Sequence, residues 1–263
     1  MTLRTVHVEP VMGTVVSIDL RGLGDHAAAV ADAVAWFHEV DARFSTYRED
    51  SEVRRVSRGE VADGDRSPDL VEVLAACERF RRLSGGRFDA WRDGALDPSA
   101  YVKGWSVDRA AGLLGLHGCQ DWMINAGGDV LTRGAPEPGM PWRVGVQHPF
   151  RKDSVAVVVA GQDLAVATSG AYERGEHIVD PIGGGVPAGV ASVTVLGPDL
   201  GSADAMSTAA FAMGTDGPAW LAGIDGFESY TVLADGRVLA TPGFPTTVAG
   251  VTISTTPADP RGL

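Results

Sequence analysis

The order of the apolar patterns constrains the fold most, because strand-like and helix-like stretches do not alternate regularly along this chain. Short stretches rich in β-branched residues, separated by Gly and Pro turns, lie at 143–147, 155–160, 190–196, 229–233 and 237–240. A helical pattern at 203–213 interrupts them. We therefore predict an α+β fold of mixed, largely antiparallel sheets with flanking helices, and not a doubly wound parallel sheet.

The first half of the chain predicts a strand followed by helices. Residues 14–20 alternate in polarity, and residues 25–43 place apolar side chains at helical spacing. Ser67 before Pro68 predicts the start of a helix that ends before Gly85, and a further helix is expected at 103–114. We expect residues 1–263 to form one domain, with a loosely ordered tail at 249–263.

Charge and cysteine content exclude several classes of function. The formal net charge of −12 repels nucleic acid and anionic membranes, so neither is expected as a partner. The two cysteines have neither the spacing of a zinc site nor that of a disulfide framework. No signal peptide, lipoprotein anchor or long apolar stretch is evident, so we expect a cytoplasmic protein without a membrane anchor.

Asp204 and Thr208 are the residues best suited to a metal ion. They lie four residues apart in a predicted helix, which places a carboxylate and a hydroxyl on one face. Mg²⁺ prefers oxygen ligands and keeps open positions for water and phosphates, so these two groups with a carbonyl or two would hold it. The alternative is that Asp204 caps the helix and Thr208 lies on the surface.

Three further segments could bind a ligand or take part in catalysis. Lys103 lies where a loop is expected to become a helix, a place where an ammonium and backbone N–H groups can hold a phosphate. His177 lies three residues before Asp180, and a histidine beside a carboxylate can serve as an acid–base group. The alternatives are a solvated lysine and a structural histidine. The segment NAGGDV at 125–130 permits either close backbone approach to a ligand or a tight turn between strands.

Taken together and in this order, these segments resemble the FAD:protein FMN transferase family, also called the ApbE family. The matching blocks span residues 11–214: VMGT at 11–14, FSTYREDSEV at 44–53, GRFDA at 86–90, LDPSAYVKGWSVDRAAGLL at 96–114, NAGGDV at 125–130, ATSGAYERGEHIVDP at 167–181, and SVTVLG with ADAMSTAAFAMG within 192–214. The resemblance implies an ApbE-like fold of two interleaved lobes.

The resemblance also implies a role for particular residues. FAD would be lined by Met12 and Tyr47 at the flavin, by Arg87, Phe88 and Asp89 along its length, and by Asp97 and Lys103. A Mg²⁺ ion would be held by the side chains of Asp204 and Thr208 and the backbone carbonyls of Ala100 and Ser207. His177 matches the family histidine implicated in catalysis, and Asp180 is the alternative group to manage the proton.

The implied activity is magnesium-dependent transfer of FMN from FAD to a Thr or Ser hydroxyl of an acceptor protein, with release of AMP. The implied acceptor motif is Asp, two small residues and Thr, which neither Thr168 nor Thr208 fits, so modification of a partner is expected. Two alternatives stay open: a FAD pyrophosphatase with water as acceptor, and a non-catalytic flavin carrier. The metal and phosphate residues argue against the carrier.

Overall fold

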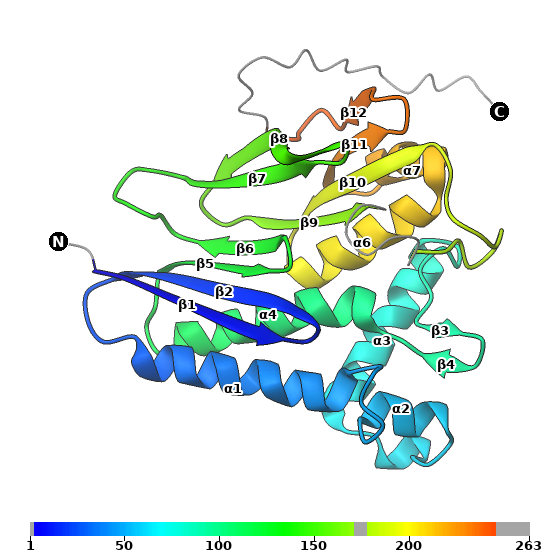
Figure 1. Ribbon diagram of the computed structural model, residues 1–263, viewed down its shortest axis with the longest axis horizontal. Coiled ribbons are helices and arrows are strands. Elements are labelled where there is room, and N and C mark those ends of the chain that lie inside the picture. Colours follow the sequence, from blue (N-terminus) through cyan, green and yellow to red (C-terminus); the bar gives the residue numbers. More distant parts are fainter. Residues whose placement is uncertain (1–2, 171–177, 246–263) are drawn as a thin grey trace.

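The computed structural model describes residues 3–170 and 178–245, which form a mixed assembly of strands and helices (Figure 1). The strands are β1 (Leu3–Val11), β2 (Thr14–Gly22), β3 (Trp91–Arg92), β4 (Ala95–Leu96), β5 (Asp121–Ala126), β6 (Asp129–Arg133), β7 (Trp142–His148), β8 (Arg151–Gly161), β9 (Ala165–Gly170), β10 (Val190–Gly197), β11 (Glu228–Leu233) and β12 (Val238–Ala240). The helices are α1 (Ala27–Phe44), α2 (Glu52–Ser57), α3 (Pro68–Leu83), α4 (Ser99–Leu116), α6 (Leu200–Ala212) and α7 (Gly217–Ala222). His177 and the predicted tail at 249–263 lie outside the described residues.

One large sheet organises the described residues. Its eight strands run in the order β1-β2-β5-β6-β9-β10-β11-β12, and every neighbouring pair is antiparallel. The junction between β6 and β9 lies in the interior of this order, where Val130 pairs with Val166. The expected α+β class with antiparallel sheets is thereby confirmed.

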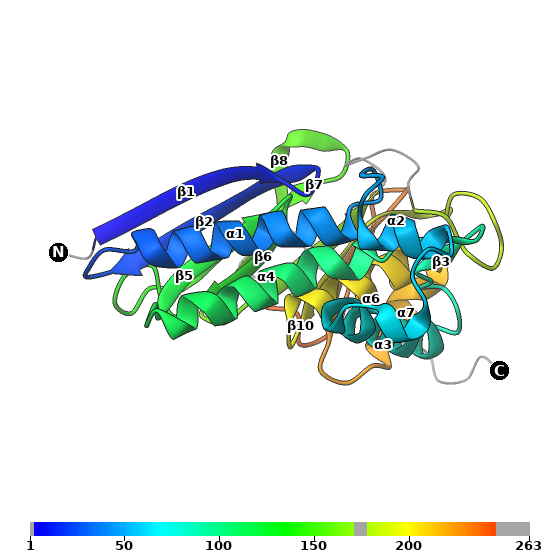
Figure 2. The ribbon, with the colours of Figure 1, turned by 90° about the horizontal axis from the view of Figure 1, so that it is seen from below.

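Helices α1, α4 and α6 cover one face of the sheet (Figure 2). α1 and α4 meet through their aromatic side chains, with Trp36 and Trp105 edge to face at 5.4 Å between ring centroids. α6 packs directly on β9 and β10. Its sequence, LGSADAMSTAAFA, has no continuous polar face, and nearly all of its residues are buried. A helix of small side chains can therefore lie between α4 and the sheet.

The opposite face of the sheet is covered by the β7–β8 hairpin. Alternate residues of β9 point to the two faces: Ala165 and Ala167 belong to the helix-side core, and Val166 belongs to a second core under the hairpin. That second core consists of aliphatic and aromatic side chains from both layers, namely Val130, Val144, Val146, Val157, Val159, Leu164, Val166, Tyr230, Val232 and Phe244.

The crossing of α4 and α6 is unusually close. A Cβ atom built on Gly104 would lie 2.3 Å from the backbone oxygen of Leu200, and one on Gly201 would lie 3.1 Å from the backbone nitrogen of Trp105. Asp108 of α4 accepts hydrogen bonds from the N–H groups of Leu200 (2.9 Å) and Gly201 (2.8 Å), so its carboxylate satisfies the first turn of α6. The two helices are therefore fixed to each other by backbone contact and by this cap.

Two helix starts differ from the sequence prediction. α4 begins at Ser99, four residues before the expected start at Lys103, because the Asp97 carboxylate accepts a hydrogen bond from Ser99 N–H and opens the turn earlier. α6 begins at Leu200, where Asp199 caps it by accepting from Ser202 N–H at 2.7 Å. The strands β1, β5, β6 and β9 are not among those predicted from the sequence.

Within residues 3–170 and 178–245, every helix is too short or too polar to cross a lipid bilayer.

The close crossing generates a stability prediction. Gly104→Ala should lower the free energy of unfolding by about 1–3 kcal/mol, because the added methyl group meets backbone that cannot move aside. Gly112→Ala, an exposed glycine of the same helix with open space around its Cβ position, should raise it by up to about 1 kcal/mol. Urea unfolding followed by circular dichroism measures both, and equal stability of the two variants would contradict the proposed packing constraint.

Candidate active site

Three charged side chains meet where α4, β6 and α6 approach one another. Lys103 Nζ lies 2.5 Å from Asp129 Oδ2 and 3.6 Å from Asp204 Oδ1. Both carboxylates are almost wholly buried, with 2% and 5% of their side chains exposed, and Lys103 is 23% exposed. Neither a solvated lysine nor a helix-capping aspartate describes these residues, so both of those alternatives are wrong.

Local structure explains how each charge reaches this point. Lys103 follows the first turn of α4, beside the glycine at the α6 crossing. Asp129 begins β6 directly after the Gly127–Gly128 turn, in which both residues have positive φ and the Asn125 carboxamide oxygen accepts from Gly128 N–H. The NAGGDV segment is thus a tight turn between strands, one of the two interpretations that its sequence allowed.

The cluster brings two carboxyl groups and one ammonium together in a buried setting. Burial raises the pKa of Asp204, the Lys103 ammonium opposes this shift, and the Asp129 carboxylate adds to it. Asp129 Oδ1 accepts a hydrogen bond from Thr168 N–H at 2.9 Å. Asp204 Oδ2 is buried and has no hydrogen-bond partner among the described residues.

A row of hydroxyl groups continues from this cluster along β9 and α6. Ser169 Oγ lies 2.9 Å from Ser207 Oγ and 3.3 Å from Thr208 Oγ1, and Ser207 Oγ donates to the Asp204 backbone carbonyl at 3.0 Å. Thr208 is half-buried and in contact with β9, so the alternative of a surface threonine is wrong. Asp204 and Thr208 lie on successive turns of α6, as the spacing predicted.

The donor set suits a hard cation. In the described part of the chain, histidine, cysteine, aspartate and glutamate side chains nowhere gather in threes at a geometry for a metal ion. Mg²⁺ does not need such a group, since one carboxylate, hydroxyls, carbonyls and water satisfy it. The unpartnered oxygen of Asp204 is the kind of buried polar atom that a cation would satisfy. Ala100 lies half-buried in the first turn of α4, and Ser207 is buried in α6.

The predicted flavin residues lie on separate elements. Met12 is in the β1–β2 turn with a positive φ of 55°, and its Sδ accepts from Ser106 Oγ of α4 at 3.7 Å. Tyr47 follows α1 and is 88% exposed. Its ring is therefore available to a ligand.

The residues predicted to line FAD between positions 87 and 97 differ in burial and in their contacts. Phe88 is buried against Phe80, 6.0 Å between ring centroids, which makes it a core residue. Asp89 and Asp97 are exposed, and the carboxylate of each accepts a hydrogen bond from the backbone N–H of the residue two positions later in the chain. Arg87 pairs with Asp180 at 2.6 Å.

Asp180 and His177 are the two candidate groups for carrying the proton. Asp180 is held by Arg87 and also accepts from Ile182 N–H at 2.9 Å, so its carboxylate already has two donors. His177 lies outside the described residues.

Asp129 and Ser169 are the residues of this cluster that sequence reasoning missed. Their signals were present: Asp129 ends the Gly-Gly-Asp part of the 125–130 turn, and Ser169 lies inside the Thr-Ser-Gly stretch. Neither signal identifies the contacting residue, because Asp129 meets Lys103 only where α4 lies on β6, and Ser169 meets Ser207 only where α6 lies on β9.

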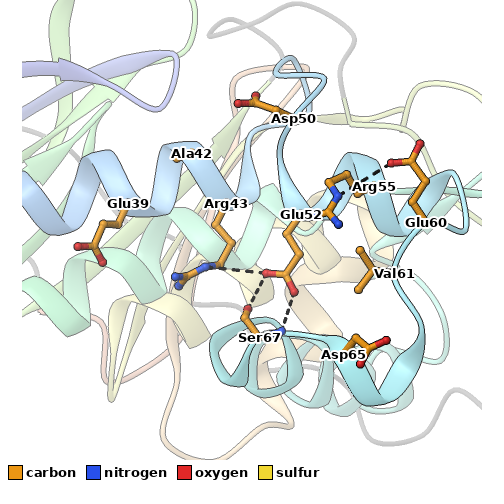
Figure 3. Close-up of a pocket in the computed structure, with 10 residues that line it drawn as sticks. All are labelled: Glu39, Ala42, Arg43, Asp50, Glu52, Arg55, Glu60, Val61, Asp65 and Ser67. Atoms are coloured by element: carbon orange, nitrogen blue, oxygen red, sulfur yellow. Dashed lines mark hydrogen bonds and ion pairs between the residues drawn. The ribbon is translucent and has the colours of Figure 1, made fainter.

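A pocket of about 580 Å³ lies elsewhere, between the end of α1, α2 and the start of α3 (Figure 3). Its polar side chains satisfy one another: Glu52 accepts from the N–H and hydroxyl of Ser67 and lies 3.9 Å from Arg43. None of the predicted site residues lines it. The charged cluster, not this pocket, is therefore the candidate active site.

Known proteins resemble this chain in sequence and in fold. The FAD:protein FMN transferase of Vibrio cholerae is 26% identical over 80% of this chain and 82% of its own length, and that of Haemophilus influenzae is 25% identical over 68% and 70%. The solved flavin transferase ApbE from Vibrio cholerae superposes with a TM-score of 0.81 at 24% identity, covering 93% of this chain and 99% of its own. The ApbE protein from Thermotoga maritima superposes with a TM-score of 0.83 at 24% identity, covering 92% and 98%.

The family model for the ApbE family matches residues 12–92 and 90–231. These ranges contain Lys103, Asp129 and Asp204, together with the helix crossing that joins them. The chain belongs to the ApbE family.

Proposed function

We propose that this protein transfers the FMN half of FAD to a Thr or Ser hydroxyl of an acceptor protein, with Mg²⁺ bound and AMP released. The observation that carries the proposal is the buried Lys103–Asp129–Asp204 cluster beside the Thr208 hydroxyl, with one Asp204 oxygen left without a hydrogen-bond partner among the described residues. A carrier that only stores flavin needs no such cluster. The names of the relatives support the reaction.

Asp204 and Thr208, with the carbonyls of Ala100 and Ser207, would hold the magnesium ion. When bound, it would neutralise the charge that builds on the pyrophosphate as the acceptor oxygen approaches. The half-buried Lys103 ammonium would face the same phosphates, and its ion pair with Asp129 holds it in one orientation. The chain's own net charge of −12 makes such local cations necessary for binding an anion.

The acceptor proton would pass to His177 or Asp180. Asp180 is already engaged by Arg87, so its carboxylate is less available to take a proton, and we therefore favour His177 for this role. Met12, Tyr47, Arg87, Asp89 and Asp97 remain proposed FAD contacts. Phe88 would act through packing, since its ring is buried against Phe80.

We also infer that one domain carries the activity and that the protein is cytoplasmic. The cluster draws residues from α4, β6, β9 and α6, so it forms only when these four elements pack together. Cys77 and Cys119 are buried and unbridged, as expected in a reducing compartment. Burial raises the pKa of the Cys77 thiol to about 12, which leaves it unreactive.

AMP release from FAD is the direct test. The wild-type protein with Mg²⁺ and a peptide carrying Asp, two small residues and Thr should release AMP and leave FMN bound to the peptide. Asp204→Asn should reduce the rate at least about 100-fold, because it removes the only carboxylate of the metal site. Asp225→Asn, an exposed aspartate in the loop before β11, is the matched control and should retain the wild-type rate.

The other outcomes separate the alternatives. AMP and free FMN without any peptide would identify a FAD pyrophosphatase. Flavin binding without AMP in either condition would identify a carrier and refute the proposal.

The structure adds a prediction about self-modification. Thr132 is the only threonine with an aspartate, Asp129, three residues before it, and Val130 and Leu131 lie between them instead of small residues. Thr132 is buried, and its hydroxyl donates to the Gln162 carbonyl at 2.7 Å. Intact mass after incubation with FAD and Mg²⁺ should therefore show no added FMN, and a stoichiometric gain would contradict the requirement for a partner protein.

A further inference from the structure

Lys103 is paired unequally with its two carboxylates. Its ammonium nitrogen lies 2.5 Å from Asp129 and 3.6 Å from Asp204, although both carboxylates are buried to a similar extent. Buried opposite charges attract strongly because little water screens them. The position of Asp129 therefore decides to which of the two carboxylates the ammonium is bound.

The two carboxylates also differ in how well they are satisfied. Asp129 Oδ2 makes no hydrogen bond among the described residues but has the ammonium 2.5 Å away as an ion-pair partner, and Asp129 Oδ1 accepts from Thr168 N–H. Asp204 has the more distant ammonium on one oxygen and, among the described residues, no hydrogen-bond partner on the other. Asp204 is thus the carboxylate that retains capacity for a further cation.

We propose that Asp129 is a positioning residue that binds the Lys103 ammonium and keeps it from closing on Asp204, so that Asp204 stays open to a divalent cation. This inference rests on the proposed function only for the choice of Asp204 as a metal ligand. Lysine has a flexible stem, and 3.6 Å is already within ion-pair reach of Asp204. Without Asp129, the ammonium loses its 2.5 Å partner and can move the short distance onto Asp204, where it competes with the metal ion.

The test is the affinity of the full chain for Mn²⁺ alone, measured from the free-ion electron paramagnetic resonance signal in the absence of FAD. The variants are Asp129→Asn, Lys103→Met and the double variant. Asparagine retains an oxygen that accepts from Thr168 N–H, and methionine retains the length of the lysine stem without its charge. Asp225→Asn controls for the loss of one negative charge from an exposed site.

Asp129→Asn should weaken Mn²⁺ binding at least about tenfold when Lys103 is present, because the ammonium moves onto Asp204. In the Lys103→Met background the same substitution should change the affinity by less than about threefold, since the competing ammonium of Lys103 is gone. This non-additivity is the signature of the proposed role.

Two results would overturn the proposal. An equal loss in both backgrounds would mean that Asp129 acts on the cation directly, and no loss in either would mean that Asp129 has no part in cation binding. If Asp129→Asn does not fold, Asp129→Ser, which also offers an acceptor to Thr168 N–H, tests the same prediction.

Mn²⁺ binding and FMN transfer are measured in separate experiments, so a failure of the proposed function can be distinguished from a failure of the role proposed for Asp129. If the variants show the expected Mn²⁺ non-additivity but the wild-type protein transfers no FMN, the proposed function alone is refuted. Protein that transfers FMN but lacks the non-additivity would refute the role of Asp129 alone.

Discussion

The contact between α4 and α6 is the constraint on which the candidate site depends. The two helices approach until the backbone of Leu200 fills the place of a side chain at Gly104, and the Asp108 carboxylate closes the first turn of α6. Lys103 is next to the glycine of this contact, and Asp204 is one turn into the second helix. Their separation is therefore fixed by packed helices and not by loops, as a precise charge arrangement requires.

Much of this fold could be predicted from the sequence, because its strong periodicities coincide with real elements. The runs of β-branched residues became β7, β8, β10, β11 and β12, and Ser67 with Pro68 does begin α3, the serine hydroxyl accepting from Leu70 N–H. β1 was missed because Pro10 lies within it, and proline argues against a central strand. β1 is an edge strand, where proline is tolerated.

The site could be predicted only in part, for a different reason. Asp204 and Thr208 are four residues apart in one helix, so local spacing sufficed to pair them. Asp129 on β6 is paired with Lys103 on α4, and no local pattern encodes that neighbour. Phe88 shows the converse: its block fits the family pattern, but local packing places the ring in the core against Phe80. Family resemblance and spacing identify segments, whereas the contacts of a side chain follow from the whole topology.

The two-faced sheet has a practical consequence. The site residues that the structure describes belong to the helix-covered side or to the loops around it, and none of them belongs to the β7–β8 hairpin, whose valines contribute to a separate core. The tip of this hairpin carries the exposed Phe150. A fluorophore or an affinity tag inserted there would report on the protein without entering the chemistry, so the hairpin is the natural handle for labelling and immobilisation.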